Sequence, residues 1–168
     1  RATGIEYRLA EKFECEEEYP ASLPAEEVAP YLSRLKSNAY PTNLAYNDLL
    51  ITADTTVVLN GDVLGKPATE AEARKMIAQL SGREHSVITG VTLRMADRER
   101  TFSSRSVVRF AALTDEQINY YVDNYHPMDK AGAYGIQEWI GYVGIESIEG
   151  SFYNVMGLPI QRLYVELE

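Results

Sequence analysis

The sequence has a single cysteine, Cys15, among its 168 residues. One cysteine cannot form an intrachain disulfide, which favours a reducing compartment and predicts a cytoplasmic protein. No apolar run approaches the roughly 20 residues that a transmembrane helix needs, so no membrane partner is expected. These two absences favour an ordinary soluble protein.

Basic residues and histidines are also scarce. Sixteen lysines and arginines stand against 25 aspartates and glutamates, which gives a formal net charge of −9. A general nucleic-acid-binding protein presents a basic face, so no nucleic-acid partner is expected. His85 and His126 have neither a paired nucleophile nor a ligand spacing, which argues against a catalytic triad and a zinc site. A Gly-x-x-x-x-Gly-Lys loop is missing too, which disfavours a motor-like NTPase.

What is present predicts one α/β domain over residues 1–168. A hydrophobic content of 45% in a chain of this length is enough to bury one sizeable core. Strand-like and helix-like segments alternate without linkers or repeats. Strands are predicted at 5–9, 49–53, 57–59, 62–64, 85–95 and 101–110, and helices from 30, from 69 to 80 and from 114 to 125.

The stretch from residue 51 to 67 carries the first chemical signal. The apolar run 49–53 predicts a buried strand, which places Asp54 where that strand leaves the core. Asn60 and Gly61 then predict a two-residue hairpin turn, because both tolerate positive φ. This turn folds Lys66 back toward Asp54, so the two side chains are predicted to face one pocket. The alternative is that Asp54 caps a turn and Lys66 is a solvated loop residue.

Five further segments bear on this choice: EEEYP at 16–20, LKSNA at 35–39, LSGREHSVITGV at 80–91, MDKAGAYGIQ at 128–137 and EGSFYNVMGLP at 149–159. Together with residues 51–67 they resemble, in order, the motifs of the Maf family of nucleoside triphosphate pyrophosphatases. The resemblance spans nearly the whole chain. It implies a Maf/ITPase-like α/β fold, with a mixed sheet and flanking helices in two lobes around a central cleft, and a homodimer.

One part of the family pattern is not found. Family members open with a first strand and a loop of the type Ser-x-Ser-Pro-Arg-Arg, whose hydroxyls and guanidinium groups hold the triphosphate. This sequence begins with RATGIEY, which resembles the family segment located just after that loop. The domain is therefore expected to lack its N-terminal strand and phosphate-binding loop.

The resemblance assigns catalytic and phosphate-binding roles. Asp54 stands at the position of the proton acceptor, and Glu17 matches an acidic residue that shares a Mg²⁺ or Mn²⁺ with it, since carboxylates suit these cations. Lys36 and Lys66 are predicted phosphate contacts, with Lys130 as a third. These lysines would let a triphosphate enter an acidic protein. Arg83 is a further candidate, although a solvated surface charge is the preferred explanation for it.

The same comparison predicts the substrate. Gln137 offers a donor and acceptors that suit the imide or amide edge of a pyrimidine, and glycines around Tyr134 permit close approach to a ligand. Gln137 and Thr55 resemble the subgroup that acts on dTTP and UTP. The expected reaction is metal-assisted hydrolysis of these nucleoside triphosphates to a monophosphate and pyrophosphate.

Two alternatives stay open at this point. One is a pyrophosphatase for methylated or other non-standard nucleotides, against which Thr55 and Gln137 weigh. The other is a non-catalytic regulator of septum formation, a role with which the family has been associated. The motive for the second is the missing phosphate loop.

Overall fold

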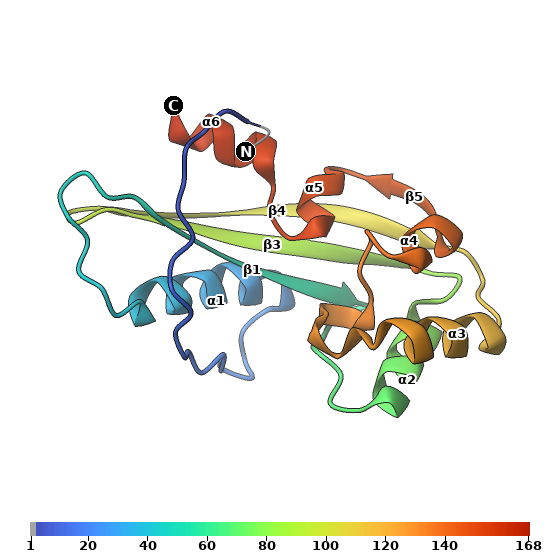
Figure 1. Ribbon diagram of the computed structural model, residues 1–168. Coiled ribbons are helices and arrows are strands. Elements are labelled where there is room, and N and C mark those ends of the chain that lie inside the picture. Colours follow the sequence, from blue (N-terminus) through green and yellow to red (C-terminus); the bar gives the residue numbers. More distant parts are fainter. Residues whose placement is uncertain (1–2) are drawn as a thin grey trace.

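A five-stranded antiparallel sheet forms the centre of the protein, as the computed structural model shows for residues 3–168 (Figure 1). Its strands follow the order β2-β1-β3-β4-β5. They are β1 Leu50–Leu59, β2 Asp62–Leu64, β3 Glu84–Arg94, β4 Glu99–Phe110 and β5 Ile145–Glu149. The longest pairing is the β3–β4 hairpin, which runs from Glu84↔Arg109 to Arg94↔Glu99.

Helices flank this sheet in two groups. Their bounds are α1 Ala25–Ala39, α2 Glu70–Leu80, α3 Asp115–Tyr125, α4 Trp139–Gly144, α5 Phe152–Met156 and α6 Ile160–Leu167, with short 3-10 turns η1 Pro127–Asp129 and η2 Ala131–Ala133. Figure 1 shows α1 and α6 on opposite sides of one half of the sheet and α2 to α5 gathered around the other half. The predicted α/β class with flanking helices is confirmed. Every strand pair within residues 3–168 is antiparallel, however, where a mixed sheet was predicted.

The hydrophobic core is divided in the same way. The larger cluster joins α2 and α3 to the sheet through residues such as Ile77, Tyr121 and Val57. A smaller cluster joins Ala29 of α1 to Val58 and its neighbours. Side chains of adjacent strand residues point to opposite faces, so Val57 and Val58 anchor the two groups of helices separately.

Several local predictions are confirmed because the signals are short-range. Asn60 and Gly61 both have positive φ, at 51° and 85°, in the turn between β1 and β2. Thr114 and Gln117 form the complete capping box that begins α3. Thr69 caps α2 by accepting a hydrogen bond from the backbone N–H of Glu72.

Three local predictions are wrong. Residues 5–9 form no strand: Ile5, Tyr7 and Leu9 alternate correctly but are exposed. Helix α1 begins at Ala25 rather than at Pro30, so the proline lies inside the helix. The strand around residues 49–53 continues to Leu59, because its pairing with β3 runs unbroken from Leu50↔Arg94 to Val58↔Ser86.

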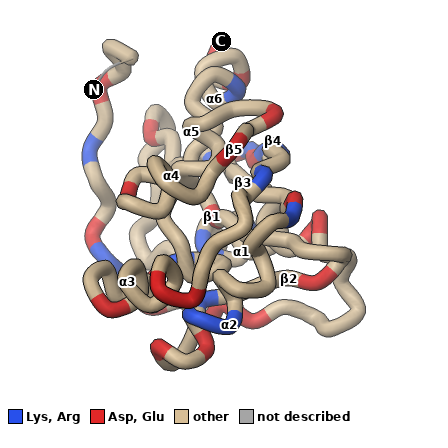
Figure 2. Tube along the Cα trace, turned by 90° about the vertical axis from the view of Figure 1, so that its right-hand side faces the viewer, with Lys and Arg blue, Asp and Glu red and all other residues tan. Residues whose placement is uncertain are grey.

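The segment before α1 has no regular secondary structure over residues 3–24. Figure 2 shows it running along the outside of the molecule, with charged residues along its length. Within residues 3–168, no helix has the length and apolarity needed to cross a membrane.

Candidate active site

Asp54 lies in the middle of β1, where its carboxylate forms the centre of a charged cluster. Its side chain is 10% exposed. Lys36 of α1 donates a hydrogen bond from Nζ to Asp54 Oδ1 at 2.5 Å, and the same Nζ lies 3.2 Å from Glu17 Oε1. The ammonium of Lys36 therefore bridges the two carboxylates. The prediction that Asp54 ends a strand is wrong, because the threonines after it continue β1.

The position of Lys36 depends on how closely α1 approaches the sheet. Asp54 pairs across the sheet with Gly90 of β3. A Cβ atom at Gly90 would lie 2.3 Å from backbone atoms of Pro30, so only glycine permits this approach. Thr52 then donates a hydrogen bond of 2.7 Å to the carbonyl of Ser33 in α1. These contacts fix the helix that presents Lys36 to Asp54.

Burial and charge shift the pKa values of this pair. Burial raises the pKa of Asp54 and outweighs the hydrogen bond and the charge of Lys36, which act in the opposite direction. Burial lowers the pKa of Lys36, but the hydrogen bonds and charges of Asp54 and then Glu17 together outweigh it, so this pKa lies above its usual value. Lys36 is thus a firmly charged cation beside a carboxylate that is easier to protonate than an ordinary aspartate.

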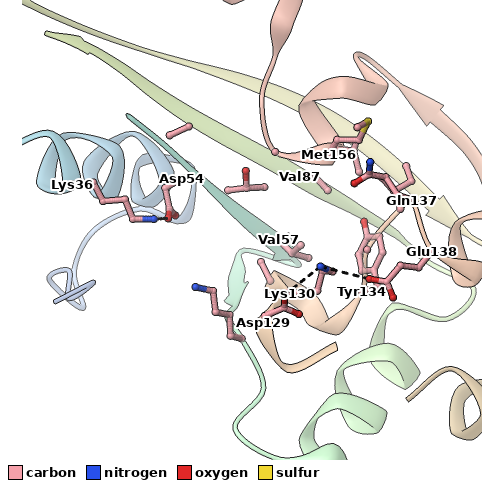
Figure 3. Close-up of a pocket in the computed structure, with 18 residues that line it drawn as sticks. Lys36, Asp54, Val57, Val87, Asp129, Lys130, Tyr134, Gln137, Glu138 and Met156 are labelled. Carbon is pink, nitrogen blue, oxygen red and sulfur yellow. Dashed lines mark hydrogen bonds and ion pairs between the residues drawn. The ribbon is translucent and has the colours of Figure 1, made fainter. Parts of the chain in front are cut away.

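A pocket of about 330 Å³ extends from this pair to the region of η2 and α5. Lys66 lines it with its Nζ 3.8 Å from Glu17 Oε2, and so does Lys130, whose Nζ lies 3.6 Å from Glu138 Oε1. Figure 3 shows Lys36 and Asp54 on one side and Lys130 with Glu138 on another. Three lysines from separate segments of the chain therefore converge on one cavity.

The remaining predicted residues divide between this pocket and the outside. Thr55 and Gln137 line the pocket, and Gln137 lies near Met156 (Figure 3). Arg83 lies just beyond α2 and is not among the lining residues. Glu17 is held at the pocket through its contacts with Lys36 and Lys66.

Thr55 belongs to a hydrogen-bond chain that the sequence did not indicate. Its Oγ1 lies 2.8 Å from Thr89 Oγ1, and Thr89 donates a bond of 3.1 Å to the carbonyl of Asn154. A hydroxyl has one proton, so Thr89 must accept from Thr55. The lone pairs of Thr55 Oγ1 then remain free to accept a hydrogen bond from a ligand. Thr89 and Asn154 lie inside two of the motif segments, but nothing in the residue pattern marks them as partners.

The donor set suits a hexacoordinate cation that is shared with a phosphate ligand. Within residues 3–168, no group of three or more His, Cys, Asp and Glu side chains is placed to hold a metal by itself. Mg²⁺ commonly uses only one or two carboxylates, together with waters and phosphate oxygens. Glu17 and Asp54 supply that number, and they already share one cation, the ammonium of Lys36.

Tyr134 is a wall of the pocket rather than an exposed stacking platform. It is 5% exposed, and its hydroxyl lies 2.6 Å from Nε2 of His85, which is also buried. Burial lowers the pKa of His85 to about 4, so the ring is neutral near pH 7. Burial also raises the pKa of Tyr134. The Tyr134 hydroxyl and His85 Nε2 therefore form a hydrogen bond between two neutral groups, which fixes the tyrosine ring beside the cavity.

This buried histidine predicts acid sensitivity of the fold. An unfolded chain binds a proton at His85 near pH 6.5, while the folded chain resists it until about pH 4. The unfolding free energy should therefore have its full value above pH 6.5. It should decrease by about 2–3 kcal/mol as the pH falls toward 4. Denaturant unfolding between pH 4 and 7 measures it. In the His85→Asn variant this part of the pH dependence should disappear. The control variant His126→Asn, which changes an exposed histidine, should keep it. Equal slopes of unfolding free energy against pH in the two variants would contradict the assignment to His85.

Comparison with known proteins agrees with the geometry. The family model described as Maf-like protein matches residues 2–168. A dTTP/UTP pyrophosphatase of Bacteroides thetaiotaomicron is 52% identical over 165 residues, covering 98% of this chain and 86% of the relative. One from Porphyromonas gingivalis is 51% identical over 170 residues, covering 99% and 85%. One from Cytophaga hutchinsonii is 48% identical over 165 residues, covering 98% and 75%.

Proposed function

The chain belongs to the Maf-like protein family, and we propose that it is a pyrophosphatase that hydrolyses dTTP and UTP to the nucleoside monophosphate and pyrophosphate. The observation that carries this proposal is the pocket itself. A largely buried carboxylate, Asp54, and three lysines from separate segments of the chain line one cavity with Gln137. Relatives about half identical to this chain bear the name dTTP/UTP pyrophosphatase, which supports the choice of nucleotide.

The reaction needs a base, a water molecule and positive charge. A water oxygen attacks the α-phosphorus, the bond from that phosphorus to the bridging oxygen breaks, and pyrophosphate leaves. Asp54 accepts the proton of the attacking water. Lys36, Lys66 and Lys130 stabilise the charge that builds up on the phosphate oxygens. Lys36 and Lys66 both contact Glu17, and Lys130 contacts Glu138 in another part of the pocket, so a triphosphate would lie between them.

Glu17 and Asp54 are the residues that would hold a Mg²⁺ or Mn²⁺. When bound, such a cation neutralises phosphate charge and lowers the pKa of a bound water. The Lys36 ammonium lies between these carboxylates, so it would have to move toward the phosphates as the cation binds. The two carboxylates would then face a positive charge in both states: the Lys36 ammonium without substrate and the divalent cation with it.

Gln137 and Thr55 provide the polar contacts for the nucleoside. The Gln137 amide can both donate to and accept from the imide edge of thymine or uracil. Thr55 Oγ1 donates to Thr89, so it is left to accept from a substrate donor. The homodimer stays a prediction from the family resemblance, and the cytoplasmic location stays a prediction from the single cysteine.

The test is pyrophosphate release from dTTP, UTP, CTP, GTP and methylated GTP, each with Mg²⁺ or Mn²⁺. The proposal expects dTTP and UTP to be hydrolysed fastest. Preferential release from methylated GTP would replace it with a function on non-standard nucleotides. Nucleotide binding without any release would favour the regulatory alternative.

A further inference from the structure

A second hollow lies beside the candidate active site. It measures about 580 Å³ and is formed by α4, β5 and α5, together with the chain before α4. Figure 1 shows these elements grouped at one end of the sheet. The hydrolysis at Asp54 and the lysines uses none of the aromatic side chains in this hollow.

The two cavities adjoin one another. Ile136, Gln137 and Met156 line both of them. Gln137 therefore stands at the junction, with the lysine-lined pocket on one side and the second hollow on the other. A ligand whose phosphates lie near Lys36 and Lys130, and whose flat end reaches Gln137, would extend into this hollow.

The lining of the hollow is unlike that of the lysine-lined pocket. The residues that form it, all within the described part of the chain, carry no charge. Three of them are exposed aromatics: Tyr142 at 85%, Tyr153 at 57% and Phe152 at 44%. The rings of Phe152 and Tyr153 meet edge to face with centroids 5.8 Å apart. These side chains do not belong to the buried clusters of the core, so packing does not explain them.

A nucleobase suits such a lining. Stacking on an aromatic ring is favourable for any base, because every base has a π-face. Each stacked base strengthens binding by a factor of about 5 to 150. A pyrimidine nucleotide combines this flat end with a polyanionic end. The two adjoining cavities match these two ends: the first is lined by charged side chains and the second by aromatic side chains.

We propose that this aromatic hollow, defined by Tyr142, Phe152, Tyr153 and the shared Met156, is the nucleobase subsite of the enzyme. The base stacks on the tyrosines while Gln137 contacts its imide edge. The inference rests on the proposed function and deepens it. An apolar wall makes no hydrogen bond to position 5 of the ring, so thymine and uracil both fit.

The test separates the base from the phosphates. We expect Tyr153→Ala and Tyr142→Ala each to bind a non-hydrolysable α,β-imido analogue of dTTP about tenfold more weakly, as measured by isothermal titration calorimetry with Mg²⁺. Inorganic tripolyphosphate, which has no base, should bind both variants as it binds the unaltered protein, which also shows that they are folded. Tyr153→Phe keeps the ring and should keep the affinity for the analogue. Tyr164→Ala, at a tyrosine of α6 with 46% exposure, is the matched control and should change neither ligand.

Each outcome decides. Unchanged affinity for the analogue in both alanine variants would overturn the subsite, and so would equal weakening of both ligands or a loss in Tyr153→Phe as large as in Tyr153→Ala. Base-dependent weakening without pyrophosphate release from dTTP by the unaltered protein would keep the subsite and overturn the proposed function. Pyrophosphate release from dTTP by the unaltered protein, together with an unchanged affinity of the alanine variants for the analogue, would keep the proposed function and overturn the subsite.

Discussion

Replacing Asp54 with asparagine is expected to lower the rate of pyrophosphate release from dTTP by a factor of about a hundred to ten thousand. An amide has almost the shape of a carboxylate but cannot accept the proton of the attacking water, and general-base catalysis contributes about this much. The Asp54 side chain is only 10% exposed and is held by Lys36 at 2.5 Å, so this carboxylate has a fixed position in the pocket. Steady-state kinetics at saturating dTTP measures the loss as a fall in kcat.

The matched control is Asp62→Asn, which removes an exposed carboxylate in the β1–β2 hairpin and should leave kcat unchanged. The pH profile adds a second check. A base must be ionised, so activity falls as the pH drops through its pKa. Burial raises the pKa of Asp54, and the acidic decline should therefore begin above the range of an ordinary aspartate. Turnover of Asp54→Asn at the rate of the unaltered protein would remove Asp54 as the base.

Replacing Gly90 with alanine is expected to cost about 3 kcal/mol or more of unfolding free energy and most of the activity. The added Cβ would lie 2.3 Å from the backbone of Pro30, and a backbone cannot rotate away as a side chain does. Helix α1 must then shift from the sheet, which carries Lys36 away from Asp54. Chemical denaturation measures the stability, and dTTP hydrolysis measures the displacement of Lys36.

Gly65→Ala serves as the control for this change, because a Cβ there meets nothing within 4 Å and the residue has no positive φ. It should alter stability by less than about 1 kcal/mol. If Gly90→Ala proved as stable and as active as Gly65→Ala, the close approach of α1 would not be what positions Lys36.

The sequence predicted those features that depend on neighbours along the chain. The Asn60-Gly61 turn and the cap at Thr114 result from local backbone chemistry, and both are present. The placement of Lys66 near the pocket is a consequence of that turn. Gln137 and Lys130 were found through the family resemblance, and the structure places them in the same cavity as Asp54.

Features that depend on contacts between distant segments were missed. Asp54 was placed at a strand end because its polar side chain interrupts an apolar run, whereas pairing with β3 carries the strand past it. The role of Gly90 depends on the approach of α1, which a one-dimensional pattern does not contain. The aromatic hollow is likewise formed by three elements, and the sequence pattern alone gives no reason to group its tyrosines.

The β3–β4 hairpin also has a consequence for the order in which we expect the molecule to fold. Its two strands adjoin in sequence and pair along their full length through a short turn, so their contacts close only small loops. Glu17, Asp54 and Lys130 lie far apart in sequence and meet only after α1, β1 and η2 have docked on that hairpin. We therefore expect the hairpin to form early in folding and the candidate pocket to form late. A partly folded chain that contains only the hairpin would therefore lack the assembled pocket.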